Sequence, residues 1–135
     1  MSADKTYLLS LFHTLITPIN GIRGYSMIIL EGNSDIASMP TEITDWVKKY
    51  SPTFDEWATK LGEIRTSDKR KLTADQLCQQ MIEALEGIEI AMHEGITLSK
   101  NTYLEGKGKT IFDYIIGTFP NIFKYYKFMQ DSLRQ

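Results

Sequence analysis

The sequence predicts an all-α fold, in which two long antiparallel helices form a hairpin and belong to a four-helix bundle. Two observations lead to this prediction. Apolar residues recur at alternating steps of four and three in two long segments, which is the spacing of helices packed lengthwise against partners. No segment shows a convincing alternation of apolar and polar residues, as a half-buried β-strand would.

Length and composition favour one soluble domain over residues 1–135. The chain has 135 residues, of which 42% are hydrophobic and 24% charged, and its formal net charge is -2. Single domains usually hold roughly 100 to 200 residues, and disordered chains carry fewer apolar residues. The charge lacks the basic character of nucleic-acid binding, and no apolar run approaches the roughly 20 residues of a membrane-spanning helix. We therefore expect a cytoplasmic protein without a nucleic-acid partner or a membrane span.

The first long helix is expected over residues 4–33. Gly32 and Asn33 form a plausible stop signal. Pro18 lies inside the pattern, where it removes a backbone donor, so a kink is predicted there. The predicted buried seam of this helix consists of Leu8, Phe12, Leu15, Ile19, Ile22, Ser26 and Ile29.

Residues 34–72 are predicted to form an insert of two short helices, with Pro40 near the start of one and Pro52 near the start of the other. Both tryptophans of the chain, Trp46 and Trp57, fall in this segment. Because large aromatic side chains gain most from burial, we expect the insert to dock on the long helices.

The second long helix is expected over residues 73–106, and a last helix over residues 110–133. Thr73 and Gln76 have the spacing of a capping box, which marks the start of a helix. The last helix is rich in aromatic residues, and such a stripe is more often core or interface than a cofactor site. The predicted seam of the second helix consists of Leu77, Met81, Ala84, Ile88, Ala91, Gly95 and Leu98.

The sequence offers little metal or disulfide chemistry, and we expect no cofactor and no metal. Cys78 is the one cysteine, and it is expected to be a small buried apolar residue. His13 and His93 lack the spacing of zinc ligands, and His93 is most simply a surface or partly buried histidine. The acids of the second long helix are most simply a solvated face, with attraction of a basic partner patch as the alternative. These acids are Glu83, Glu86, Glu89 and Glu94.

His13 is the residue with the clearest chemical potential. With Thr17, Asn20 and Gly24 it lies at steps of four, three and four along the first helix, beside the apolar seam. It directly follows the seam residue Phe12 and so points about 100° away from it, toward the outer flank. An accessible imidazole that is neutral near physiological pH is a competent phosphoryl acceptor.

The residues around His13 resemble a known family. Residues 12–26, Phe-His-Thr-Leu-Ile-Thr-Pro-Ile-Asn-Gly-Ile-Arg-Gly-Tyr-Ser, resemble the H-box of the dimerisation and phosphoacceptor domain of sensor histidine kinases. The match includes the histidine, the apolar residue two positions on, and the pair Thr17-Pro18. Residues 98–100, Leu-Ser-Lys, followed by Gly106, resemble the end of the second helix of such domains.

The resemblance implies a homodimer in which two hairpins form the four-helix bundle, with His13 displayed on its flank as the phosphoacceptor. Thr17 would be the residue that positions a water for dephosphorylation of a partner. Thr14, Asn20 and Gly24 would belong to the partner-binding surface. The implied partners are the receiver domain of a response regulator and a separate histidine kinase.

The chain also departs from the family pattern. Thr14 stands where the family commonly has an acid, and a hydroxyl cannot replace that acid as a base. Ile16 stands where the family has a basic residue. The residues after Gly106 are too few for an ATP-binding domain, so no autonomous kinase activity is expected.

These observations leave several interpretations open. One function is histidine phosphotransfer through His13 in two-component signalling. The alternative is a catalytically inactive dimeric scaffold that docks a response regulator or a partner kinase. A chance resemblance, with His13 merely solvated, is a third interpretation. For the fold, an internal four-helix arrangement, in which the insert and the last helix replace the second protomer, is the alternative to the homodimer.

Overall fold

The computed structural model describes residues 4–32 and 39–134, and all regular structure in these two ranges is helical. This confirms the all-α prediction. The elements are α1 (Lys5–Glu31), α2 (Thr41–Thr66), α3 (Ala74–Ala84), α4 (Ile88–Asn101) and α5 (Gly106–Leu133). In the described part of the chain, no helix has the length and the apolar character needed to cross a membrane.

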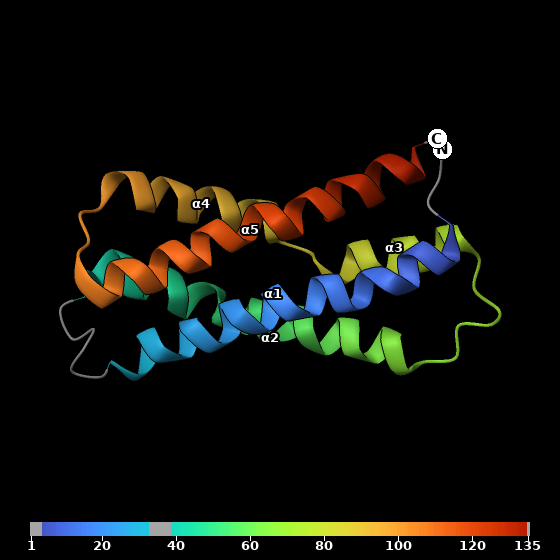
Figure 1. Cartoon of the computed structure of the whole chain (residues 1–135), viewed down its shortest axis with the longest axis horizontal. Helices are drawn as coiled ribbons and strands as arrows, with labels where there is room; N and C mark the ends of the chain where they lie inside the picture. The colour runs from blue at the N-terminus through green and yellow to red at the C-terminus, as the bar shows by residue number, and fades with distance from the viewer. Residues whose placement is uncertain (1–3, 33–38, 135) are drawn as a thin grey trace.

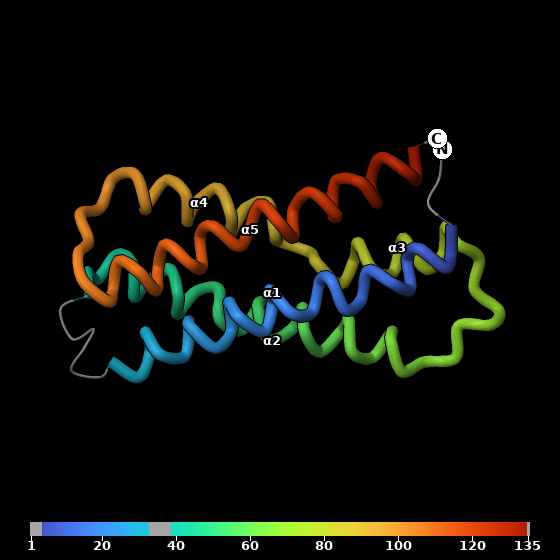
Figure 2. The backbone as a smooth tube through the Cα atoms, in the orientation of Figure 1, coloured from blue at the N-terminus to red at the C-terminus, as the bar shows by residue number. Residues whose placement is uncertain are grey.

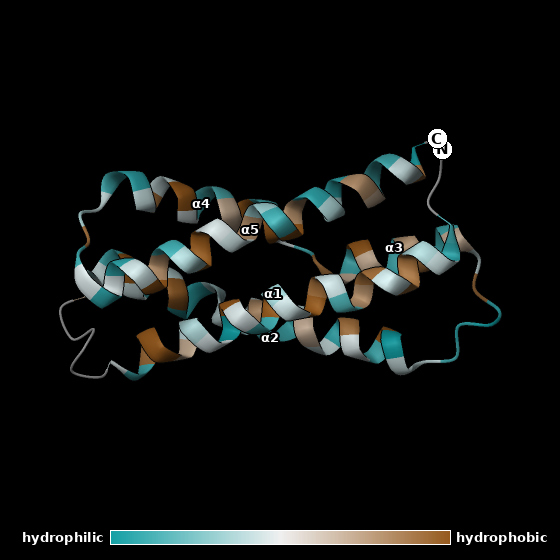
Figure 3. Cartoon of the chain, viewed as in Figure 1, coloured by the Kyte–Doolittle hydropathy of each residue, from teal (hydrophilic) through white to brown (hydrophobic). Residues whose placement is uncertain are grey.

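The helices lie along one long axis, with α3 and α4 following each other end to end (Figure 1). α1 packs against α2 and α5, and the α3–α4 pair packs against the same two helices. α1 also contacts α3. The start of α1 and the end of α5 lie at the same end of the molecule (Figure 2). Each helix carries both hydrophobic and hydrophilic residues, as packing on one side and hydration on the other require (Figure 3).

The predicted antiparallel hairpin of the two long helices is wrong. Figure 2 shows that α1 and the α3–α4 pair run in the same direction along the long axis, while α2 and α5 run in the opposite direction. The physical reason lies in the segment predicted as an insert. It forms α2, a helix of 26 residues beside the 27 residues of α1, which carries the chain back to the end where α1 began.

α1 matches the predicted first helix closely. The Asp4 carboxylate accepts a hydrogen bond from the backbone N–H of Tyr7 at 2.7 Å and caps the first turn. Gly32 ends the helix with a φ of 61°, in the left-handed region that favours glycine. The helix continues through Pro18, and every residue of the predicted seam is buried.

α2 differs from the prediction of two short helices, because it runs without a break through Pro52. A proline inside a helix costs about 3 kcal/mol, since it removes one backbone hydrogen bond and crowds the preceding turn. Buried aromatic residues on both sides of Pro52 offset this cost, at roughly 1.5 to 3 kcal/mol for each large apolar side chain. These residues are Trp46, Tyr50, Phe54 and Trp57.

The predicted second long helix is broken into α3 and α4. Its start is confirmed, because Thr73 and Gln76 form the predicted capping box. The break comes at Gly87, whose φ of 91° an L side chain would adopt only with strain. The indole N–H of Trp57 donates to the carbonyl of Glu86 at 2.8 Å, so α2 satisfies a backbone group that the break leaves unpaired. Leu85 and Ile88 remain buried across the break.

Aromatic rings of α2 and α5 meet in the centre of the core. The ring of Trp46 lies 5.7 Å from that of Phe112 and 6.0 Å from that of Phe119, both in edge-to-face contact. This confirms that part of the aromatic stripe of α5 is core. α4 approaches Trp46 closely because Gly95 has no side chain there, and a Cβ at this position would lie 2.8 Å from Cζ2 of Trp46. Cys78 is buried, as predicted.

Candidate functional site

The site residues that the sequence singles out are all exposed on α1. His13, Thr17, Asn20 and Gly24 follow one another along its surface, as their spacing predicts. The Thr17 hydroxyl donates to the backbone carbonyl of His13 at 3.1 Å, so its proton is engaged while its oxygen remains open to a donor. Thr14 is also exposed but points about 100° further around the helix from His13.

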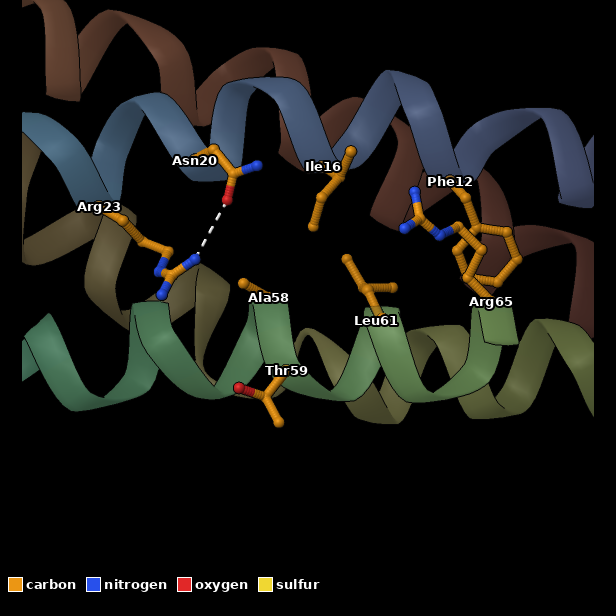
Figure 4. Close-up of a pocket in the computed structure, with 9 residues that line it drawn as sticks. Phe12, Ile16, Asn20, Arg23, Ala58, Thr59, Leu61 and Arg65 are labelled. Carbon is orange, nitrogen blue, oxygen red and sulfur yellow. Dashed lines mark hydrogen bonds between the residues drawn. The ribbon is translucent and has the colours of Figure 1, made fainter. Parts of the chain in front are cut away.

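A groove between α1 and α2 lies beside this row. Its cavity volume is about 220 Å³. Asn20 is the one residue of the exposed row that lines the groove, whereas His13 and Thr17 directly follow its lining residues Phe12 and Ile16 and so lie about 100° further around α1. Ile16 and Leu61 point toward each other across it (Figure 4). The remaining lining residues are Asn20, Arg23, Ala58, Thr59, Gly62 and Arg65.

The groove exists because α2 presents small residues opposite α1. Ala58 and Gly62 are one turn apart on α2, and both line the cavity. A Cβ built on Gly62 would have no neighbour within 4 Å, which shows open space above this glycine. A larger side chain at position 62 would therefore enter the groove and not the core.

Two arginines give the groove a positive character. Arg23 donates from Nε to Oδ1 of Asp55 at 2.9 Å and from a terminal nitrogen to Oδ1 of Asn20 at 3.2 Å. The first of these contacts compensates its charge. Arg65 has no carboxylate partner among residues 4–32 and 39–134, and Figure 4 shows it next to Phe12 at the other end of the groove. The positive charge that has no carboxylate partner therefore lies at the end of the groove that contains Phe12, the residue before His13.

The sequence analysis missed Arg65, because α2 contributes it from the segment predicted as an insert. No spacing within residues 12–26 could have indicated it. The resemblance would place a basic residue at position 16, but Ile16 gives the groove an apolar surface there. Arg65 of α2 supplies a cation next to Phe12.

His13 has no acidic partner in the described part of the chain, in agreement with the departure at Thr14. The histidine that does lie beside a carboxylate is His93 on α4, whose Nε2 is 3.8 Å from Oε1 of Glu89 one turn earlier. The side chain of His93 is well exposed. Within the described ranges, no three His, Cys, Asp or Glu residues come together in a group that could hold a metal ion.

Comparisons of the chain with protein-family models, with curated proteins and with solved structures found no match. The resemblance of residues 12–26 to the H-box therefore rests on those residues themselves.

Proposed function

We propose that the protein is a histidine phosphotransfer module of two-component signalling, with His13 as the phosphoacceptor. The observation that carries this proposal is the position of His13. Its imidazole is exposed on the flank of a long helix whose opposite side is buried, and it directly follows Phe12, which lines a groove together with Arg65, an arginine without a carboxylate partner in the described ranges. A rigid helix holds the nucleophile in place, while its exposure leaves it open to a phosphorylated partner.

The chemistry requires no ATP-binding domain in this chain. The unprotonated nitrogen of the His13 imidazole attacks the phosphorus of a phospho-aspartate in a receiver domain, so a P–N bond forms as the P–O bond to the carboxylate breaks. The carboxylate leaves with the electron pair, and the imidazole proton passes to water. A separate histidine kinase is the alternative source of the phosphoryl group.

The groove supports the docking of such a partner. The row Thr17, Asn20 and Gly24 presents small uncharged residues, so a receiver domain can approach α1 closely. An apolar side chain of the partner fits between Ile16 and Leu61, and Arg65 attracts an anionic group. Thr17, with its oxygen open to a donor, is the residue that would hold a water during dephosphorylation of the partner.

A docking module without chemistry is the second candidate, and Thr14 and Ile16 favour it. Thr14 replaces the acid that the family uses as a base, and Ile16 replaces a basic residue. In this case the same surface of α1 binds a response regulator or a partner kinase, and His13 is never phosphorylated.

We also propose that the four-helix bundle is closed within one chain. The seam residues that the sequence assigned to a dimer interface are buried by α2 and α5 of the same chain, so these residues are not accessible to a second copy. Light scattering should give a mass near 15.5 kDa. A stable mass of twice this value would contradict the proposal and restore the homodimer.

Phosphotransfer is tested by labelling. The protein is incubated with radiolabelled phosphoramidate, and separately with a panel of receiver domains carrying radiolabelled phospho-aspartate. Acid-labile, base-stable label should appear on the wild type and disappear in His13→Ala. His93→Ala is the matched control, since it removes the other exposed histidine, and it should retain the label. Label that persists in His13→Ala would refute the site, and absence of label with every donor would favour the docking module.

A further inference from the structure

A second groove lies on the opposite side of α2, where α2 meets α3 and α4. It consists of two adjoining cavities of about 520 and 420 Å³, which share Lys49 and Glu94. Its lining residues on α2 lie on average about 160° around the helix from those that line the groove beside His13. The two grooves are therefore separate surfaces, and the second does not contain the proposed phosphoacceptor.

The floor and walls of this groove, which we name the α2–α4 groove, include large apolar side chains. Trp46 and Leu98 line the first cavity, and Trp57 and Ile90 line the second. Ile90 is 63% exposed, which is the second-highest exposure among the large hydrophobic residues described. Covering such a side chain contributes roughly 1.5 to 3 kcal/mol when its burial is complete.

Carboxylates surround the groove in excess over cations. Both lysines that line it are already paired, Lys49 with Glu94 at 3.3 Å and Lys60 with Glu56 at 2.9 Å. Four other carboxylates line it and have no ion-pair partner in the described ranges. They are Glu42 and Asp45 at the first cavity, and Glu83 and Glu86 at the second.

We propose that the α2–α4 groove binds a basic amphipathic helix of a partner protein. The apolar face of that helix covers Ile90 and Leu98, and lysine or arginine residues at its two ends meet the two pairs of carboxylates that lack an ion-pair partner. The negative rim repels nucleic acid and anionic membranes, so a basic protein segment is the partner that complements it.

The dimensions of the groove favour a helix over a small molecule. Trp46 and Trp57 are eleven positions apart on one continuous helix, which corresponds to about 16 Å at 1.5 Å per residue. A partner helix of about three turns spans this distance and presents residues to both cavities. A compact organic cation reaches only one pair of carboxylates.

The test uses a fluorescent synthetic peptide of about four turns, with leucines at steps of three and four and lysines near both ends. Its binding to the full chain is measured by fluorescence anisotropy. A peptide of the same composition but scrambled order is the control for pattern, and spermine as competitor is the control for charge without an apolar face. We expect the amphipathic peptide to bind best and to weaken as salt rises, because rim charges are screened beyond about 8 Å at physiological ionic strength.

Matched protein variants locate the binding. The groove variant combines Asp45→Lys with Glu86→Lys. The control variant combines Glu31→Lys with Asp75→Lys, two exposed acids that do not line the groove, so both variants change the net charge by the same amount. All four positions are exposed, and circular dichroism checks that both variants fold. The groove variant should bind about tenfold more weakly or worse, and the control should bind within about twofold of the wild type. Equal losses in both variants, equal binding of the scrambled peptide, equal competition by spermine, or no binding would each overturn the proposal.

Discussion

The hydroxyl group of Tyr50 on α2 donates a hydrogen bond to the carboxylate of Glu94 on α4, with an O–O distance of 2.7 Å. Lys49 adds an ion pair to the same carboxylate at 3.3 Å. The hydrogen bond from Tyr50 is the largest single cause that holds the pKa of Glu94 below its ordinary value, and the contacts with Lys49 act in the same direction. Burial raises the pKa of Tyr50, so the hydroxyl keeps the proton that it donates.

This contact predicts a contribution to the pH dependence of stability on the acid side. Because the folded pKa of Glu94 is depressed, the ionised carboxylate stabilises the fold above its ordinary pKa of 4.5. The contribution is lost as the pH falls through the folded pKa. In Tyr50→Phe we expect a smaller fall of Tm between about pH 5 and pH 3 than in the wild type.

The measurement is thermal unfolding of both proteins across this pH range. Tyr103→Phe is the control, since it removes an exposed hydrogen bond from a tyrosine to Glu105 at the surface, and its Tm should follow the wild type. If Tyr50→Phe and the wild type lose Tm in parallel, Glu94 does not make this contribution.

Gly95 and Gly117 provide a contrast between a helical glycine that the packing requires and one that it does not. A Cβ at position 95 would lie 2.6 Å from Cδ1 of Ile116 and 2.8 Å from Cζ2 of Trp46, whereas a Cβ at position 117 has no neighbour within 4 Å. Gly95→Ala should lower the free energy of unfolding by about 1 to 3 kcal/mol despite the better helix propensity of alanine. Gly117→Ala should raise it by up to about 1 kcal/mol. Urea denaturation measures both changes, and a stabilised Gly95→Ala would show that Trp46 and Ile116 yield easily.

Ser26 interrupts the apolar seam of α1 with a hydroxyl group that has no hydrogen-bond partner among the described residues. Since an unsatisfied buried hydroxyl costs about 1 to 3 kcal/mol, Ser26→Ala should leave stability unchanged or raise it by about 1 kcal/mol. Ser132 is the matched control, because it is also buried but donates to the carbonyl of Phe128 at 3.0 Å. Ser132→Ala should be the less favourable substitution in urea denaturation, and the reverse order would contradict this account.

The seam residues show how much of the fold the sequence predicted. Every predicted seam residue of α1 is buried, and so are those of α3 and α4 except Leu98, which is half-buried. The period of the apolar pattern determines which side of a helix faces the core, and it does so locally. The capping box at Thr73 was likewise predicted, because both partners lie within one turn.

What the sequence did not predict depends on distant contacts. Pro52 looked like a helix start, but α2 continues through it, and the aromatic residues that offset its cost pack on α5. Gly87 looked like part of a continuous helix, and the break is stabilised by Trp57 from another helix. The direction of the second long helix followed from the first of these differences, because the continuous α2 carries the chain back to the end where α1 began. In the candidate site, the row on α1 was predicted from spacing, whereas Arg65 reaches the groove from α2.

Cys78 offers a probe of global unfolding. Its side chain is 2% exposed, and its thiol donates to the carbonyl of Met129 at 3.3 Å. Burial raises the pKa of the thiol, which keeps it in the unreactive protonated form. We expect a thiol reagent to label native protein slowly and unfolded protein at once, with the native rate rising with urea. Fast stoichiometric labelling without denaturant would contradict the position of Cys78 in the core.

The groove beside His13 allows docking to be separated from chemistry. Gly62→Leu places a large side chain in open space between α1 and α2, and it should fill the groove without disturbing the fold. If a receiver domain docks there, the rate at which it phosphorylates His13 should fall by about tenfold or more, as loss of an apolar anchor costs more than about 1.4 kcal/mol. Labelling by phosphoramidate should be unchanged, since this small donor needs no groove.

Gly117→Leu is the control, with an equally open position on α5, and should leave both rates unchanged. Equal loss of both rates in Gly62→Leu would mean that the groove acts on His13 itself, and an unchanged receiver rate would place the docking surface elsewhere on α1.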